Sequence, residues 1–326
     1  MLNRFGEQIR YLLVNKDYLP GPDMGTSQDL ITNMYRRLSI PITKTSTGGK
    51  NSGYFTSLSV MVGIKKSLES LRLNLKDCSF AVEGFGSVGE SLALKLYRQG
   101  AVIVAISTVQ GALYDENGLE IPEIISFKQQ HSRDWIKKFE KAEHIEKEEL
   151  LELEVDVLCP CGRSYQINED NMKRIRSKVI CAGANNPVTP EADEHLFKEG
   201  VLYLPYFATN CGGVLGNAME FMGLNEKMIE ELIMKRVGWK LEKIIAMSKE
   251  QDKTPLDIGT RIAEESFASL KQEKEQQKGR SFLYDFGLNM YRRGFIPKLL
   301  LRGYAYSYFD KMLKQDVDVY RKYLAC

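Results

Sequence analysis

The sequence predicts an α/β protein, a Rossmann-type doubly wound parallel sheet with flanking N-terminal and C-terminal helices. Short apolar runs alternate with helical patterns through the middle of the chain, which is typical of βαβ units. A glycine-rich segment lies between one such run and a helix. With 326 residues, of which 43% are apolar, the chain is long enough to form a sizeable core.

Charge and hydropathy narrow the class of protein. The 45 Lys and Arg residues nearly balance 43 Asp and Glu, for a net charge of +2, so nothing indicates a nucleic-acid surface. No stretch approaches the roughly 20 apolar residues that span a bilayer, and the first residues lack the apolar core of a secretion signal. We expect a cytoplasmic protein, with no membrane contact, whose partners are small molecules.

The N-terminal segment is predicted to be helical. Apolar residues recur at helical spacing over 1–17, and the Pro-Gly-Pro sequence at 20–22 ends that pattern. A short helix is predicted over 28–38 and a longer one over 54–71. The Gly- and Ser-rich stretch at 46–53 between them predicts a linker.

Strands and helices are predicted to alternate from residue 78 onward. A buried strand over 78–82 is followed by a helix over 87–99 and a strand over 101–107. Turn residues at 115–118 indicate an insert, with charged helices up to about residue 151. Three further strands are expected over 155–159, 178–182 and 201–204, with a helix over 190–199 between the last two.

The remainder is predicted to be almost wholly helical from residue 211. Its last 48 residues contain 11 Phe or Tyr and nine Lys or Arg. Interleaved aromatic and basic residues could bind nucleic acid, but we favour a helical appendage that packs on the protein or on another subunit. The expected domains are a residual helical unit over 1–53, a dinucleotide-binding domain over 54–225, returning helices over 226–278 and an aromatic, basic tail over 279–326.

The six cysteines predict free thiols, because no secretion signal indicates an oxidising compartment. Cys159 and Cys161 form a C-x-C step at the end of an apolar run. This step lacks the spacing and the second pair of a structural zinc site. We therefore expect no metal.

The chemistry lies in the glycine-rich segment Gly84-Phe85-Gly86-Ser87-Val88-Gly89. A G-x-G-x-x-G directly after a strand and before a helix is the dinucleotide fingerprint. Its glycines permit a tight turn, the approach of backbone N–H groups to a pyrophosphate and close packing of helix on strand. NAD or NADP is the predicted cofactor. The alternative is a domain that keeps its glycines for packing and binds no nucleotide.

The end of the second predicted strand leaves the choice of cofactor open. An acid that binds the adenosine ribose is expected about 20 residues after the glycines. The chain has Ser107 and Thr108 there instead. No arginine stands beside them to recruit a 2′-phosphate, so the preference between NAD and NADP is undetermined.

Several ordered segments besides the fingerprint carry a family resemblance. They lie at 4–9, 18–26, 55–66, 156–162, 181–187, 209–214 and 260–265. Together they resemble the glutamate/leucine/phenylalanine/valine dehydrogenases, nearer to the leucine and phenylalanine branch, from about residue 2 to about 270. The resemblance implies oxidative deamination of an L-amino acid to its 2-oxo acid, or the reverse, with transfer of a hydride to the nicotinamide.

The resemblance also assigns roles to particular residues. Asp23 matches the aspartate that shuttles protons, although an Asp in a Pro-Gly loop is also a common turn former. Thr56 matches a threonine near cofactor and substrate, and Asn210 an asparagine that fixes the nicotinamide and the substrate. The other residues expected at the cofactor are Thr108, Cys161, Gly162, Ala184 and Asn185.

One part of the family pattern is not matched. In the family, a glycine-rich segment with catalytic lysines lies upstream of the helix that opens this chain, and Lys16, Lys44 and Lys50 match none of its motifs. Three interpretations follow: a subunit of a split dehydrogenase whose partner provides the lysines, a remodelled reductase of an imine or oxo acid, or an inactive nucleotide-binding pseudoenzyme that regulates or scaffolds. We expect a homo- or hetero-oligomer.

Overall fold

The structure of the chain is a computed structural model. It describes residues 2–15, 17–18, 20–21, 26–42, 52–131, 134–276, 290–291 and 297–314. In this part of the chain, no helix has both the length and the apolar character needed to cross a membrane.

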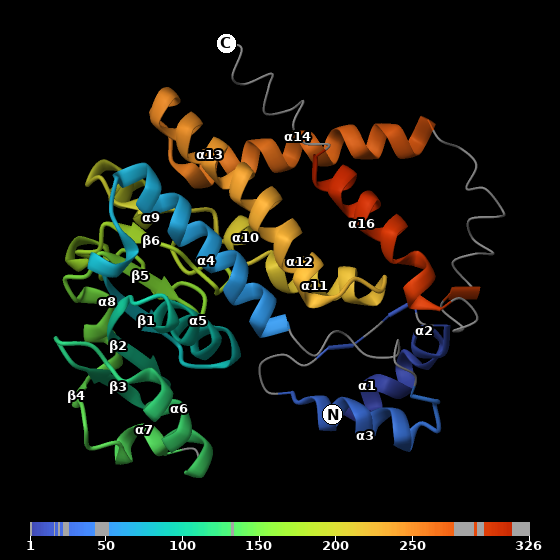
Figure 1. The fold of residues 1–326 in the computed structure, drawn as a ribbon, viewed down its shortest axis with the longest axis horizontal. Coiled ribbons are helices and arrows are strands. Elements are labelled where there is room, and N and C mark those ends of the chain that lie inside the picture. The colour runs from blue at the N-terminus through green and yellow to red at the C-terminus, as the bar shows by residue number, and fades with distance from the viewer. Residues whose placement is uncertain are drawn as a thin grey trace.

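A mixed sheet with a parallel centre organises the chain (Figure 1). The parallel strands are β1 (Ser79–Glu83), β2 (Val102–Thr108), β5 (Val157–Pro160), β6 (Val179–Ile180) and β7 (Leu202–Tyr203). Two antiparallel strands, β3 (Gly111–Tyr114) and β4 (Glu143–Ile145), extend one edge, which gives the order β4-β3-β2-β1-β5-β6-β7. The chain leaves β1 toward β2 and later returns to the other side of β1 with β5. Sheets of this kind bind ligands outside the carboxyl ends of the two strands at such a reversal, here β1 and β5.

The predicted doubly wound sheet is confirmed, but the expectation of purely parallel strands was incomplete. All five predicted strands are present, each within two residues of its expected bounds. β3 and β4 lie in the segment expected to hold an insert and charged helices. They have only four and three residues, and β4 exposes Glu143 and His144, so neither produces the apolar run that marks a buried strand.

Helices connect the strands and flank them at both chain ends. Their bounds are α1 (Leu2–Gln8), α2 (Arg10–Asn15), α3 (Gln28–Arg37), α4 (Ser52–Leu71), α5 (Ser87–Arg98), α6 (Ile121–Gln130), α7 (Trp135–Lys138), α8 (Lys147–Glu152), α9 (Pro190–Lys198), α10 (Tyr206–Thr209), α11 (Gly212–Phe221), α12 (Glu226–Leu232), α13 (Gly238–Gln251), α14 (Pro255–Gln276) and α16 (Lys298–Lys314). A π-helical turn, η3 (Ile233–Val237), joins α12 to α13, and short 3₁₀ turns lie at Leu75–Asp77 and Met172–Arg174. The helix predicted over 1–17 is interrupted at Ile9, between α1 and α2.

The strands bury side chains on both faces, as a doubly wound sheet requires. Phe80 and Val82 of β1 belong to the core on the side of α4, α5 and α11, whereas Ala81 between them belongs to the core on the side of α8 and α9. β5 alternates in the same way, with Val157 and Cys159 on the first side and Leu158 on the second. α1 to α3 enclose a smaller core of their own, formed by Leu13, Ile31, Met34, Tyr35, Leu38 and Ile40.

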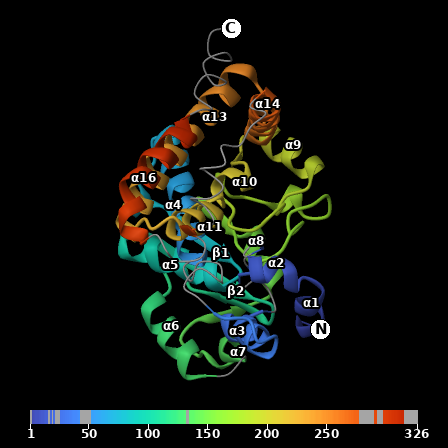
Figure 2. The ribbon, with the colours of Figure 1, turned by 90° about the vertical axis from the view of Figure 1, so that its right-hand side faces the viewer.

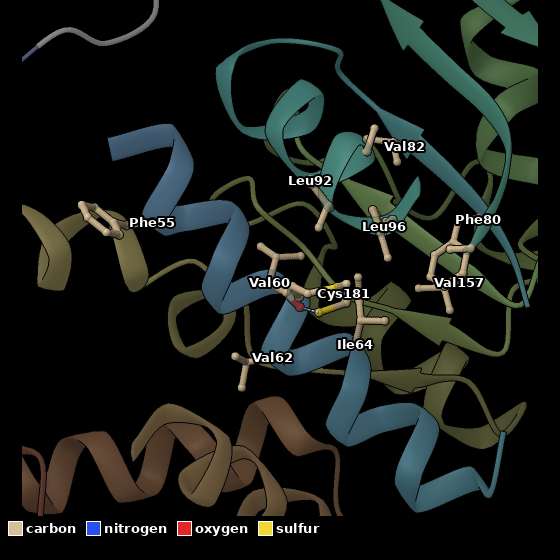
Figure 3. Packing of buried hydrophobic residues seen from close by; sticks show 14 of the residues in the cluster. Phe55, Val60, Val62, Ile64, Phe80, Val82, Leu92, Leu96, Val157 and Cys181 are labelled. Atoms are coloured by element: carbon tan, nitrogen blue, oxygen red, sulfur yellow. Dashed lines mark hydrogen bonds between the residues drawn. The ribbon is translucent and has the colours of Figure 1, made fainter. Parts of the chain in front are cut away.

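α4 is the central helix of the first face (Figure 3). Val60 and Ile64 are buried along it, beside the α5 side chains and the strands, whereas the buried Phe55 lies farther along the helix, at Gly216 of α11. Cys181, directly after β6, donates its thiol hydrogen to the Val60 carbonyl across 3.4 Å. α4 therefore packs against the sheet near the carboxyl end of β6.

The C-terminal helix α16 packs beside α11, α12 and η3 (Figure 2). Arg236 of η3 donates to Asp310 across 2.7 Å, and Tyr306 donates to Glu231 across 2.8 Å. Ala305 and Phe309 are buried in the interface with these helices. The described part of the aromatic tail thus packs on the body of the protein.

Candidate cofactor site

The glycine-rich loop follows β1 and can be formed only by glycine at two of its positions. Gly84 has a φ of +88°, and a Cβ there would lie 2.6 Å from the backbone nitrogen of Gly162. A Cβ on Gly89 would lie 2.1 Å from the Gly84 carbonyl oxygen. The turn after β1 and the close packing of α5 on the strand therefore both depend on missing side chains.

Gly86 differs from its neighbours because the space beside it is open. A Cβ there would have no described heavy atom within 4 Å apart from those of its chain neighbours. Gly86 is the N-cap of α5, and the first helical hydrogen bond runs from Glu90 back to its carbonyl. The amides of Ser87 and Val88 precede that bond and have no acceptor within the helix. The open space beside Gly86, next to amides without a helical acceptor, fits the pyrophosphate of a dinucleotide.

Contacts on both sides fasten this loop. The amide of Phe85 donates to the Ser107 carbonyl across 2.6 Å, and the amide of Gly84 donates to the Ser107 hydroxyl across 3.1 Å. The Phe85 ring is buried 5.9 Å from that of Trp135, centroid to centroid. Lys128 of α6 donates to the Phe85 carbonyl across 3.0 Å. The backbone and side chain of Phe85 therefore anchor the loop.

Thr108 lies at the carboxyl end of β2, where the sequence analysis expects the ribose site. Its hydroxyl accepts a hydrogen bond from the Gln110 amide across 3.1 Å, and its backbone pairs with Gly111. Thr108 thus closes the turn into β3. Neither this hydroxyl nor that of Ser107 replaces the negative charge of the missing acid.

The loops after β5 and β6 bring further predicted residues together. Gly183 and Ala184 donate their amides to the Pro160 carbonyl, across 2.8 and 3.0 Å. Asn210 donates its side-chain amide to the Asn185 side chain across 2.7 Å and to the Ala184 carbonyl across 3.4 Å. Ala184, Asn185 and Asn210 therefore form one cluster, as expected of residues that face one ligand.

The first turns of α4 lie at the same edge. A Cβ on Gly53 would lie 2.9 Å from the Ser87 carbonyl oxygen, so α4 approaches the start of α5. Thr56 is buried, and its hydroxyl donates to the Ser52 carbonyl across 2.9 Å. A Cβ on Gly213 would lie 2.4 Å from that hydroxyl oxygen. Thr56 thus lies between α4 and α11, next to the loop that contains Asn210.

Glu83 is a site residue that the sequence analysis missed. It ends β1 and is only 9% exposed, and its carboxylate accepts the Gly162 amide across 2.9 Å. Burial raises the pKa of Glu83, while hydrogen bonds from the amides of Gly162 and Cys161 act against that rise. The available signal was an acid at the end of an otherwise apolar strand, directly before the first glycine.

Three thiols lie beneath these loops, at Cys159, Cys161 and Cys181. Burial raises the pKa of all three, that of Cys161 to about 12, so they are protonated at neutral pH. In the described part of the chain, no three His, Cys, Asp or Glu side chains are arranged to hold a metal ion.

Asp23, the predicted proton shuttle, lies outside the described residues, as do Lys16, Lys44 and Lys50. The structure therefore brings together the fingerprint loop, Cys161, Gly162 and the cluster around Asn210. Thr108 and Thr56 flank that set on either side. This arrangement can bind a dinucleotide across the carboxyl ends of β2, β1, β5 and β6.

Comparison with known proteins gives a family match and similar curated sequences. The model of the glutamate/leucine/phenylalanine/valine dehydrogenase family matches residues 48–277. Glutamate dehydrogenase of Thermotoga maritima is 32% identical over 231 residues, covering 67% of this chain and 55% of that protein. NAD-specific glutamate dehydrogenase of Staphylococcus aureus is 32% identical over 243 residues, covering 70% and 57%. The chain thus spans somewhat more than half the length of these relatives.

Solved structures with the same fold include two dehydrogenases that are named for different amino acids. Hetero-hexameric glutamate dehydrogenase from Thermus thermophilus has a TM-score of 0.68 at 21% identity and covers 79% of this chain and 64% of its own. L-tryptophan dehydrogenase from Nostoc punctiforme has a TM-score of 0.58 at 25% identity, with coverage of 83% and 73%. Closeness to the leucine and phenylalanine branch stays a prediction.

Proposed function

The chain belongs to the glutamate/leucine/phenylalanine/valine dehydrogenase family, and from this premise we propose that it is an amino acid dehydrogenase-like oxidoreductase that uses NAD or NADP. The observation that supports this most is the open space beside Gly86, the N-cap residue at the start of α5. The reaction would be oxidative deamination of an L-amino acid, or reductive amination of a 2-oxo acid. The bound nicotinamide would supply the hydride acceptor or donor.

Each group of residues has a separate task in this proposal. The amides of Ser87 and Val88 would bind the pyrophosphate, and Gly86 keeps the approach clear. The hydrogen-bonded pair Asn185 and Asn210 would position the nicotinamide end. Asp23 would move protons between substrate and solvent, a role that rests on the family resemblance alone.

In this chemistry a lysine activates water, and no lysine of the 326 residues lies in a matching motif. We therefore propose that a partner chain contributes it and completes the active site. A hetero-hexameric glutamate dehydrogenase from Thermus thermophilus has the same fold. This likeness supports an oligomer in which one chain contributes a lysine to the active site of another. The unmatched lysine motif equally favours a second candidate, an inactive nucleotide-binding subunit that regulates or scaffolds.

The first experiment measures cofactor binding by calorimetry on the full chain. NAD, NADH, NADP and NADPH are titrated into the wild type, Gly86→Asp and Gly303→Asp. We expect roughly micromolar binding of at least one cofactor, lost in Gly86→Asp because a carboxylate then fills the pyrophosphate space. Gly303 is a matched control because its Cβ position is also open, but it lies on α16.

Two outcomes would contradict the cofactor proposal: a folded wild type that binds none of the four, or a Gly86→Asp variant that binds as the wild type does. A second assay distinguishes the two candidate functions. NADH or NADPH oxidation is followed with a panel of 2-oxo acids and ammonia, with and without co-expressed neighbouring gene products. Turnover in any arm supports the enzyme. Binding without turnover in every arm supports the regulatory subunit.

A further inference from the structure

Glu83 stands at the junction of the two loops that form the candidate cofactor site. It is the last residue of β1 and directly precedes Gly84. Its backbone carbonyl accepts the Cys161 amide across 2.7 Å, which continues the pairing of β1 with β5. Its carboxylate accepts the next amide, that of Gly162, across 2.9 Å. One residue therefore holds the first two amides after β5.

The packing around this carboxylate leaves no room for a side chain at Gly84 or Gly162. A Cβ on Gly162 would lie 2.2 Å from a Glu83 carboxylate oxygen, and a Cβ on Gly84 would lie 2.6 Å from the Gly162 nitrogen. The two glycines and the carboxylate thus form one closely packed group. Separation of the loop after β5 from the fingerprint loop would break the hydrogen bond from the Gly162 amide to Glu83.

We propose that Glu83 is a positioning residue of the cofactor site, one that ties the loop after β5 to the fingerprint loop and takes up a proton when a dinucleotide binds. The proposal rests on the proposed function, because it places an anionic pyrophosphate at the fingerprint loop. A second negative charge near a buried carboxylate disfavours its ionised form. By linkage, binding then becomes tighter as the pH falls.

The charged and titratable groups around Glu83 are few. The Cys161 thiol lies beside it on the strand end, and burial keeps that thiol protonated. Arg163, after β5, and Lys147, on α8, are the cations whose charges stabilise the carboxylate. From β2, the hydroxyl and the carbonyl of Ser107 contact the start of the fingerprint loop, and neither group is charged. Desolvation acts against these favourable contacts and is the larger effect.

The test is calorimetry of NADH binding to the full chain in phosphate and in Tris, from pH 6 to pH 8.5. The difference in apparent enthalpy between the two buffers gives the number of protons taken up. For the wild type we expect uptake of a fraction of a proton, up to one, and a dissociation constant that rises by up to about tenfold per pH unit. Infrared spectra of the unaltered chain should gain a protonated-carboxyl band when NADH is added.

Three variants distinguish the proton uptake by Glu83 from its hydrogen bond to the Gly162 amide. Glu83→Gln keeps an oxygen for the Gly162 amide but does not titrate, so we expect a dissociation constant that changes by less than about twofold from pH 6 to pH 8.5, and no proton uptake. Glu83→Ala removes the acceptor, so we expect binding weakened by about fivefold or more, because the Gly162 amide loses its partner. Asp193→Asn is the matched control, because it neutralises another buried carboxylate, on α9, away from both loops. It should retain the proton uptake of the wild type.

Proton uptake that persists in Glu83→Gln, or wild-type binding without any uptake, would overturn the proposal. Equal affinities for Glu83→Ala and the wild type would overturn the tie. If Glu83→Gln does not fold, the infrared band of the unaltered chain decides the protonation. A folded wild type that binds no NADH at all would instead refute the proposed function.

Discussion

At the scale of single residues, four glycines determine how closely the loops of the candidate cofactor site can pack. Gly84, Gly89 and Gly162 each occupy a position where a methyl group would overlap a backbone or carboxylate atom. Gly86, two residues from Gly84, has open space instead. The four glycines therefore have different physical roles. Gly84, Gly89 and Gly162 allow backbone and carboxylate atoms to approach closely, and Gly86 leaves the space in which we propose that the pyrophosphate binds.

Asp193 shows how one buried acid affects stability. It lies on α9, is 5% exposed and has a carboxylate oxygen without a hydrogen-bond partner among the described residues. Burial raises its pKa to about 6, and a hydrogen bond from Thr254 opposes this rise. In the unfolded chain, an aspartate ionises near 3.8. The contribution of Asp193 to stability is therefore complete below pH 4 and is lost as the pH rises through 6.

Asp193→Asn should remove this pH dependence. At pH 7.5 the variant should have a free energy of unfolding higher than that of the wild type by up to roughly 3 kcal/mol, the equivalent of the shift in pKa. At pH 4 the two should be nearly equal. Urea denaturation at pH 4, 6 and 7.5 measures the difference. A variant that is less stable than the wild type at pH 7.5 would contradict this prediction, because the ionised Asp193 carboxylate would then stabilise the folded protein.

At the scale of elements, the crossing of α4 and α11 is the closest helix contact of the site. A Cβ on Gly212 would lie 1.9 Å from the Phe55 carbonyl oxygen, and one on Gly216 would lie 2.2 Å from the Phe55 ring. The two helices approach so closely because α11 begins with small residues. This crossing holds Thr56 beside the loop that contains Asn210.

Gly212→Ala should therefore destabilise the protein by about 2–3 kcal/mol, because backbone on both helices has to move apart. Gly303→Ala is the control, since its Cβ position on α16 is open. It should stabilise the protein by about 0.5–1 kcal/mol, because alanine favours a helix over glycine. Chemical denaturation of both variants gives these differences. Equal effects of the two substitutions would refute the close crossing.

The predicted elements show what sequence patterns can and cannot supply. The five buried strands were predicted because continuous apolar runs are the mark of a strand covered on both faces. β3 and β4 gave no such run, and their places in the sheet depend on pairing, of β3 with β2 and of β4 with β3, rather than on their own composition. The interruption of the first helix at Ile9 was likewise invisible, because the apolar spacing continues across it.

The candidate site was predicted to a similar extent. The fingerprint has a fixed spacing, so its loop and the helix after it were placed correctly. The cluster of Ala184, Asn185 and Asn210 joins segments 25 residues apart, and it was expected only through the family resemblance. Glu83 was missed because its significance comes from Gly162, which lies 79 residues further along the chain. Distant partners of this kind leave no local pattern.

At the scale of the whole molecule, the sheet brings all parts of the candidate site to one edge. The loops after β1, β5 and β6 and the end of β2 meet at the carboxyl ends of parallel strands. α4 and α11 cover that edge from one face (Figures 1 and 2). A ligand that contacts several of these elements at once should stabilise the folded state as a unit.

NADH should therefore raise the resistance of the main sheet to unfolding. At a free concentration 100 times its dissociation constant, the expected gain in unfolding free energy is about 2.7 kcal/mol. Thermal unfolding with increasing NADH, followed by circular dichroism, measures this gain. The melting temperature of Gly86→Asp should not respond. A shift of equal size in that variant would place the stabilising site elsewhere on the molecule.

Two buried thiols can report how often the sheet separates from α4. Cys159 and Cys181 have no exposed surface, and their raised pKa values keep them protonated. An alkylating reagent therefore reacts with them only after the sheet has separated from α4. The rate of their labelling in native buffer measures how often the central packing opens, without any substitution in the chain. A ligand at the carboxyl edge that holds α4 on the sheet would appear as slower alkylation.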